Sequence, residues 1–169
     1  MHSIKAYFVP EAPNYSLLAL PVMFFLSMAP HWYSVAAVEQ IRTADGFPLQ
    51  SPRVFFMQLA ARPVAGDKKS EHTPLERRIL RCNACQQNGM ENLPVFGLTL
   101  LCGIVAQLPG GYMNLLAVIY LVLRTMFNVA YIFTDSKSLA TFRSMIFMGH
   151  GLIYFQVFVK SAFAVAGRK

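Results

Sequence analysis

Four long apolar segments most limit how this chain can fold. They run from about Tyr15 to Val38, Leu93 to Leu108, Tyr112 to Phe133 and Leu139 to Val165. Each approaches the ~20 residues that a helix needs to cross the hydrocarbon core of a bilayer. Only helices and closed barrels satisfy their own backbone there, and the alternation typical of barrel strands is not visible. The sequence therefore predicts an all-α integral membrane protein, with four transmembrane helices bundled in a single domain over residues 1–169.

Composition and charge favour a membrane protein over a nucleic-acid-binding one. Apolar residues make up 55% of the chain and charged residues 14%, whereas soluble domains carry about 25% charged residues. The net charge is +7, and eight of the fifteen basic residues lie between Arg42 and Arg81. Because short cytosolic loops collect Lys and Arg, we expect the loop of about residues 43–73 to be cytosolic. The lipid bilayer is the expected partner, and no nucleic acid is expected.

The helix ends can be placed more closely. Helices are expected at about residues 15–40, 74–108, 112–133 and 139–165. Thr73-Pro74-Leu75-Glu76 predicts a capping box at the start of the second helix, which is longer than a bilayer needs and should begin in the cytosol. The preceding loop contains an apolar patch, VFFMQLA, which we expect to lie along the membrane surface or to cover the bundle.

The long second helix carries a polar stripe. Spacings of three and four place on one face Arg77, Arg81, Ala84, Asn88 and Glu91, with Gln87 and Asn92 on either side. Ionisable residues of membrane helices normally face a bundle interior or a wet cavity, so the stripe predicts a binding site. The alternative is a salt bridge of Glu91 with Arg124 or Arg143 that merely fixes helix packing.

Cysteine and histidine have simpler interpretations. The chain has three cysteines, and an odd count argues against a disulfide framework. Cys82-x-x-Cys85 has the spacing of half a metal or redox motif, but no second ligand pair accompanies it. We interpret both as packing thiols and expect no metal site. His150 lies midway along the last apolar segment and is interpreted as an interhelical hydrogen-bond partner.

Residues 87–96 also carry a family resemblance. Gln87-Asn88-x-x-Glu91-Asn92-Leu93-Pro94-x-Phe96 resembles the second-helix signature of the MAPEG family, the membrane-associated proteins of eicosanoid and glutathione metabolism. The chain resembles the microsomal glutathione transferases and prostaglandin E synthases of this family. Shorter matches to the other helices of the prostaglandin E synthases are Gln40-Ile41-Arg42, Arg124-x-x-x-Asn128-Val129-Ala130-Tyr131 and Phe142-Arg143-Ser144. The likeness covers most of the chain from Arg42 to about Gly149.

The resemblance implies a homotrimer in the endoplasmic reticulum or another internal membrane, with glutathione bound between subunits. It places glutathione contacts at Arg42, Gln87, Asn88, Glu91, Tyr131 and Arg143, and catalytic roles at Arg143, Ser144 and Tyr131. Glutathione carries two carboxylates and one ammonium, which suit arginines and a carboxylate such as Glu91. Arg143 would stabilise the thiolate, with Ser144 as an auxiliary donor. The second substrate would be a lipophilic electrophile from the bilayer.

Three functions remain open, because the chain departs from the family pattern. Ala84 stands where many active relatives have arginine, and Phe127 replaces a polar ring. Arg81, one turn earlier on the stripe, is the residue that could compensate for Ala84. The first function is a glutathione-dependent transferase, peroxidase or isomerase. The second is a glutathione-independent isomerase or cyclase of an apolar small molecule, using Glu91, Arg143 or Tyr131. The third is a non-enzymatic scaffold that binds lipid.

Overall fold

The computed structural model describes residues 7–41, 50–61, 72–134 and 137–168, and no strand occurs among them. A 3-10 turn, η2 (Ser16–Leu18), leads into the helices, which are α1 (Ala19–Glu39), α2 (Pro52–Ala61), α3 (Pro74–Val105), α4 (Gly110–Phe133) and α5 (Lys137–Ala166). The all-α fold is therefore confirmed. The observed ends differ from the expected ones by a few residues, and α2 is a helix within the segment that was expected to be a loop.

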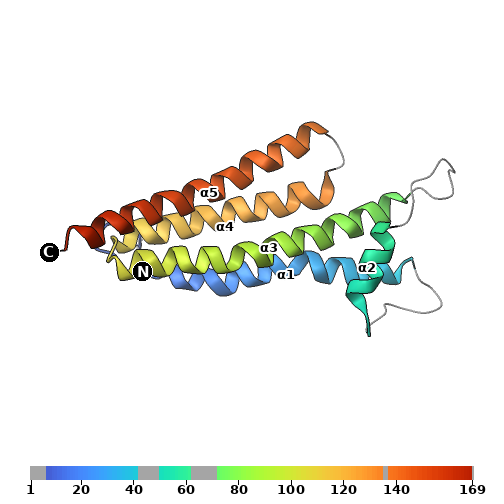
Figure 1. Ribbon diagram of the computed structural model, residues 1–169, viewed down its shortest axis with the longest axis horizontal. Coiled ribbons are helices and arrows are strands. Elements are labelled where there is room, and N and C mark those ends of the chain that lie inside the picture. Colours follow the sequence, from blue (N-terminus) through green and yellow to red (C-terminus); the bar gives the residue numbers. More distant parts are fainter. Residues whose placement is uncertain (1–6, 42–49, 62–71, 135–136, 169) are drawn as a thin grey trace.

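The four long helices run side by side in one bundle (Figure 1). α1 packs on α3 and α4, whereas α5 packs on the other side of the same two helices and does not contact α1. α2 crosses one end of the bundle against α3, and the described chain begins and ends at the opposite end (Figure 1). α3 is thus the central helix, since it contacts each of the other four.

Three helices are long and apolar enough to cross a membrane: Ser16–Glu39, Gly110–Phe133 and Thr141–Ala166. α3 is the longest helix, with 32 residues, but it does not qualify among the described residues because its first half carries the polar stripe. The spans indicate an integral membrane protein. Within the described ranges, a fourth helix of this length and apolar character is not found, although the sequence predicts four.

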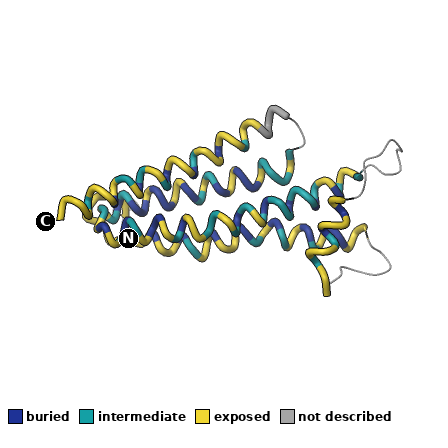
Figure 2. The backbone as a smooth tube through the Cα atoms, in the orientation of Figure 1, coloured by how far each residue is buried: buried dark blue, intermediate teal, exposed yellow. Residues whose placement is uncertain are grey.

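The interior of the bundle is built from apolar and aromatic side chains of all four long helices. Met23, Phe96, Tyr120 and Val157 belong to one buried cluster. The rings of Phe96 and Tyr120 stack with their centroids 3.9 Å apart. Large apolar side chains also cover the outside of the helices, where exposed residues predominate (Figure 2). An apolar exterior around a packed interior suits helices whose solvent is lipid.

The ends of α3 are fixed by side chains. At its start, Glu76 N donates to Thr73 Oγ1 at 3.2 Å and Thr73 N donates to Glu76 Oε2 at 2.8 Å, so the predicted capping box is present. At its other end, the Arg168 guanidinium donates to the carbonyls of Val105 and Ala106. A cation there satisfies free carbonyls and opposes the helix dipole.

α2 covers one end of the bundle, which is one of the two positions expected for the apolar patch. Phe56 and Leu59 are buried against Ala37 and Val38 of α1 and Ile79 of α3. The neighbouring Met57 is 70% exposed, so α2 presents one apolar face to the bundle and another outward.

Phe56→Ala should release α2 from the bundle, because the buried ring provides much of its contact. Loss of about 2–4 kcal/mol of packing should speed tryptic cleavage after Arg53 at least tenfold. Limited proteolysis in detergent measures this, and Met57→Ala is the matched control because that side chain lies outside. Equal cleavage of the two variants would contradict the docking of α2 through Phe56.

Candidate functional site

A buried arginine lies at the centre of the bundle. Arg124 of α4 is fully buried, and its Nη1 donates to Asn88 Oδ1 at 2.8 Å while Nη2 donates to the Cys85 carbonyl at 3.2 Å. The guanidinium carbon lies 4.9 Å from the centre of the Phe127 ring. Its Nε has no hydrogen-bond partner in the described part of the chain. Asn88, a predicted glutathione contact, is therefore used inside the protomer.

The salt bridge considered as an alternative for Glu91 is not formed. Glu91 is exposed, and within the described ranges it makes no ion pair with Arg124 or Arg143. Asn88 is turned toward Arg124 of α4, whereas Glu91, three residues on, is exposed and lines a pocket with residues of α1 and α2. The prediction that both side chains share one face of the helix is therefore wrong. Glu91 is thus available to a ligand, because Arg124 and Arg143 do not engage it in helix packing.

The polar centre extends to the neighbouring helices. Asn128 Nδ2 donates to the Leu26 carbonyl of α1 at 2.7 Å, and Cys85 Sγ donates to Asn128 Oδ1 at 3.3 Å. On the α5 side, the hydroxyls of Tyr120 and Tyr154 lie 2.6 Å apart. Buried polar groups are costly unless satisfied, so this network holds the register of α1, α3, α4 and α5.

His150 does not match its expected role fully. It is buried, and its ring meets Tyr120 edge-on with centroids 4.7 Å apart. Nε2 has no hydrogen-bond partner among the described residues. The histidine therefore packs against aromatic rings, and the expected interhelical hydrogen bond is not formed at that nitrogen.

An open cleft of about 630 Å³ lies between α1, α2 and α3. It is lined by Met28, His31, Pro52, Arg53, Phe56, Asn83, Gln86, Gln87, Met90 and Glu91. Two of the predicted contacts, Gln87 and Glu91, lie here. His31 and Arg53 were missed, because a lone histidine in an apolar segment and an arginine in an expected loop carry no motif. Only the docking of α2 brings Arg53 to α3.

The other predicted residues lie elsewhere. Arg143 of α5 stacks on Tyr131 of α4, with its guanidinium carbon 4.0 Å from the ring centre, and Ser144 beside it is exposed. None of the three lines the cleft. Arg42 lies outside the described residues. Within one protomer the predicted site is therefore divided between the cleft, the buried centre and the α4–α5 pair.

Two arginines near the start of α3, Arg78 and the stripe residue Arg81, hold helices together at the end that carries α2. Arg78 Nη1 donates to the Tyr33 hydroxyl of α1 at 3.3 Å, and that hydrogen bond raises the pKa of Arg78. Arg81 Nε donates to the Ile132 carbonyl near the end of α4 at 3.2 Å. Arg81 was expected to compensate for Ala84, but it does not line the cleft because α4 engages it.

The CxxC cysteines are interior residues. Cys82 and Cys85 are both fully buried, and both thiols are free. Burial raises the pKa of Cys82 to about 12, so its thiol stays protonated at neutral pH. This environment is that of a packing residue.

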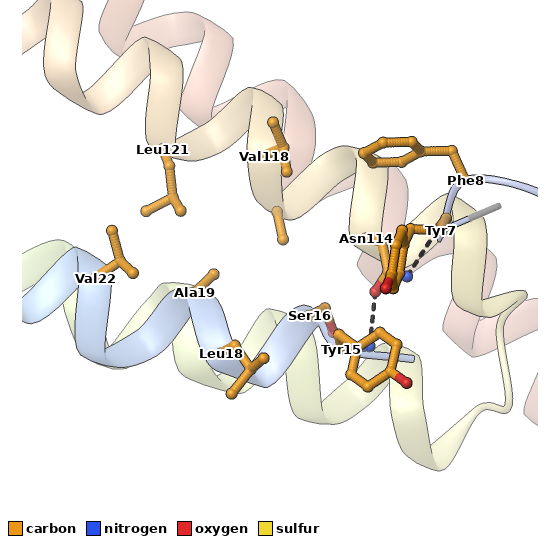
Figure 3. Close-up of a pocket in the computed structure, with 11 residues that line it drawn as sticks. Tyr7, Phe8, Tyr15, Ser16, Leu18, Ala19, Val22, Asn114, Val118 and Leu121 are labelled. Atoms are coloured by element: carbon orange, nitrogen blue, oxygen red, sulfur yellow. Dashed lines mark hydrogen bonds between the residues drawn. The ribbon is translucent and has the colours of Figure 1, made fainter. Parts of the chain in front are cut away.

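A separate apolar groove runs between α1 and α4, near the end where the described chain begins (Figure 3). A pocket of about 290 Å³ there shares Val22, Val118 and Leu121 with a second pocket of about 370 Å³ farther along the same two helices. Asn114 closes the groove at one end: its Oδ1 accepts from Tyr15 N at 2.7 Å, and its Nδ2 donates to the Tyr7 carbonyl at 2.8 Å (Figure 3). An amide inside an apolar segment was a signal that could have indicated this closure.

The comparisons with known proteins give one match. A model of the MAPEG family matches residues 16–163, from η2 to near the end of α5. The match is to the family as a whole and does not single out a glutathione transferase or a prostaglandin synthase. Neither a curated protein nor a solved structure matches the chain.

Gly89 makes room for the buried arginine. A Cβ at this position would lie 2.7 Å from Ser27 Cβ and 2.9 Å from Arg124 Nη2, whereas a Cβ at Gly97 of the same helix meets only Leu20 Cδ2 at 3.6 Å. Contacts below 3 Å force neighbouring atoms to move, and overpacking of this kind costs about 1–3 kcal/mol.

Gly89→Ala should therefore lower the thermal unfolding midpoint in detergent by several degrees. Gly97→Ala should leave the midpoint unchanged or raise it, because alanine is the better helix former. Circular dichroism at 222 nm follows both transitions. A loss of stability in Gly97→Ala as large as in Gly89→Ala would show that the close contact with Arg124 is not the cause.

Proposed function

The chain belongs to the MAPEG family, and from that membership we propose that it is a glutathione-dependent enzyme of the endoplasmic reticulum or another internal membrane. It would act as a transferase, peroxidase or isomerase on a lipophilic electrophile. The observation that carries the proposal is the cleft between α1, α2 and α3. Its volume of about 630 Å³ lies in the usual range for small-molecule sites, and it contains a carboxylate, Glu91, without a partner among the described residues.

Four membrane passes are supported by the path of the chain. α1 and α4 both have the composition of a span, and α1 ends beside α2 whereas α4 begins at the opposite end of the bundle. α3 connects these two ends, and we therefore propose that it crosses the bilayer as well. Its apolar second half, which follows the polar stripe, is suited to the hydrocarbon region, while its basic first turns and the loop before them suit the cytosol.

The division of the predicted contacts supports a homotrimer. Gln87 and Glu91 line the cleft, whereas Arg143 and Tyr131 meet on the α4–α5 pair, and α5 does not contact α1. A neighbouring protomer that lays its α4–α5 pair beside the cleft would complete the site from both sides. One ligand would then bind at each subunit boundary.

Glutathione supplies a nucleophilic thiol when it is bound, and the residues of the chain would prepare that thiol. Arg143 would place a positive charge beside the sulfur and so favour the thiolate. Tyr131 lies against the face of the Arg143 guanidinium and orients it, leaving the N–H donors at its edge free to point toward a ligand. The lipophilic substrate would reach the site from the bilayer, and the groove between α1 and α4 is an apolar surface on which it can lie.

Isothermal titration of the purified protein with glutathione tests the binding step. We expect a dissociation constant between micromolar and millimolar, weakened about tenfold or more in Glu91→Gln because an ammonium loses its charged partner. Glu39→Gln is the matched control, since Glu39 is also exposed but lies at the end of α1 and does not line the cleft. No heat with the wild-type protein would rule out the glutathione-dependent function.

Arg143→Ala tests the chemical step separately. Glutathione should still bind, but the ultraviolet absorbance of the bound thiolate should be lost and turnover of a generic electrophile should fall about a hundredfold or more. Arg143→Lys should retain part of both signals, because it keeps the charge. Undiminished turnover in Arg143→Ala would exclude this arginine as the group that stabilises the thiolate.

Phe127 favours a second function, a glutathione-independent isomerase or cyclase of an apolar small molecule. The side chain is buried among Arg124, Tyr131, Phe147 and His150, and it offers no polar atom where the family pattern has a polar ring. Turnover of an electrophile without glutathione would favour this function. Binding of a fatty acid without turnover would favour a lipid-binding scaffold instead.

A further inference from the structure

Arg53 of α2 lines the cleft and brings a positive charge to it. It forms no ion pair or hydrogen bond with another described residue. Phe56, one turn farther along α2, also lines the cleft and is buried among Val38 and Ile79, which fixes α2 against the bundle. The position of Arg53 is thus set by a packed helix and not by a free chain.

The same cleft holds the opposite charge. Glu91 lines it from α3, together with the amides of Asn83, Gln86 and Gln87, and none of these side chains has a hydrogen-bond partner among the described residues. An unpartnered cation, an unpartnered carboxylate and three amides make a surface that suits a ligand with both charges. A ligand bearing only one charge would leave one of the two groups unmatched.

An amino-acid terminus of the α-amino acid type has these properties. Its ammonium and carboxylate are attached to the same carbon, so the two charges are presented together. In glutathione this arrangement occurs only at the γ-glutamyl end, since the glycine end has a carboxylate alone. Guanidinium and carboxylate pair through two parallel hydrogen bonds, and a carboxylate accepts from an ammonium, so each group in the cleft has a complement.

We propose that the cleft under α2 recognises the γ-glutamyl end of glutathione, with Arg53 binding its carboxylate and Glu91 its ammonium. This inference rests on the proposed function and adds to it. It makes α2 a specificity element of the site, because α2 supplies the cation and docks on α1 and α3 through Phe56. It also gives the two arginines different roles, since Arg53 would bind the γ-glutamyl carboxylate whereas Arg143 would act at the sulfur.

Titration calorimetry with three probes tests the assignment. Glutathione and γ-glutamylcysteine keep the γ-glutamyl end, whereas cysteinylglycine lacks it. We expect wild-type protein to bind the first two with similar affinity and cysteinylglycine at least about tenfold more weakly. Arg53→Ala should weaken glutathione and γ-glutamylcysteine about tenfold or more, while the weak affinity for cysteinylglycine stays unchanged.

Two further variants test the charge of Arg53 separately from its paired hydrogen bonds and control for its position on α2. Arg53→Lys should recover part of the affinity, because it keeps the charge but loses the paired hydrogen bonds. Gln58→Ala, an exposed position of α2 that does not line the cleft, should bind like the wild type. All variants should share the thermal unfolding midpoint of the wild type, since the Arg53 side chain is exposed.

The results distinguish failure of the Arg53 assignment from failure of the proposed function. If wild-type protein binds glutathione and Arg53→Ala binds it equally well, the assignment of Arg53 is overturned while the proposed function stands. If Arg53→Ala weakens glutathione and cysteinylglycine by the same factor, Arg53 contacts another part of the ligand and the assignment is also overturned. If wild-type protein binds none of the three probes, the proposed function itself fails.

Discussion

A charge is costly in the low dielectric of the bundle interior. Arg124 is the buried charge on which the contacts between α1, α3 and α4 at the centre of the bundle depend. A buried guanidinium is stable only if its donors are accepted, and Asn88 and the Cys85 carbonyl provide that acceptance from α3. Gly89 leaves the space for it, and Ser27 of α1 closes the space from the far side. The position of α3 relative to α1 and α4 is therefore set by one charge, and the outer face of α3, with Gln87 and Glu91, is positioned as a consequence.

This division of α3 into two faces explains how a packing centre and the proposed ligand site can coexist on one helix. Asn88 turns inward to Arg124, whereas Glu91, one turn along, is exposed at the cleft. A carboxylate that paired with Arg124 would neutralise the centre and leave the cleft without its negative charge. Satisfying the arginine with an amide and a carbonyl keeps the carboxylate free.

The main helices and the start of α3 could be predicted from the sequence, because apolar length and the Thr73–Glu76 capping box are local signals. The role of Arg124 could not, since the same residue could equally have paired with Glu91. The place of Arg53 could not be predicted either, because it lies in a ten-residue helix that carries no motif, and only tertiary packing brings it to α3. Of the predicted site, Gln87 and Glu91 share a cleft, and Arg143 and Tyr131 share a contact, but a link between the two pairs remains a prediction.

The mixed character of α3 also bears on how the protein enters the membrane. The insertion machinery of a cell selects segments by their apolar character, and a central arginine costs about 2.5–3.5 kcal/mol. α1, α4 and α5 each have the length and apolar character of a span, although α4 carries the buried Arg124, whereas α3 is polar in its first half. In the proposed four-pass topology, the short turn between Val105 and Gly110 would let α3 and α4 enter as one hairpin, in which Asn88 would already accept from the arginine. The pairing that orders the finished bundle would then also lower the cost of inserting these two helices.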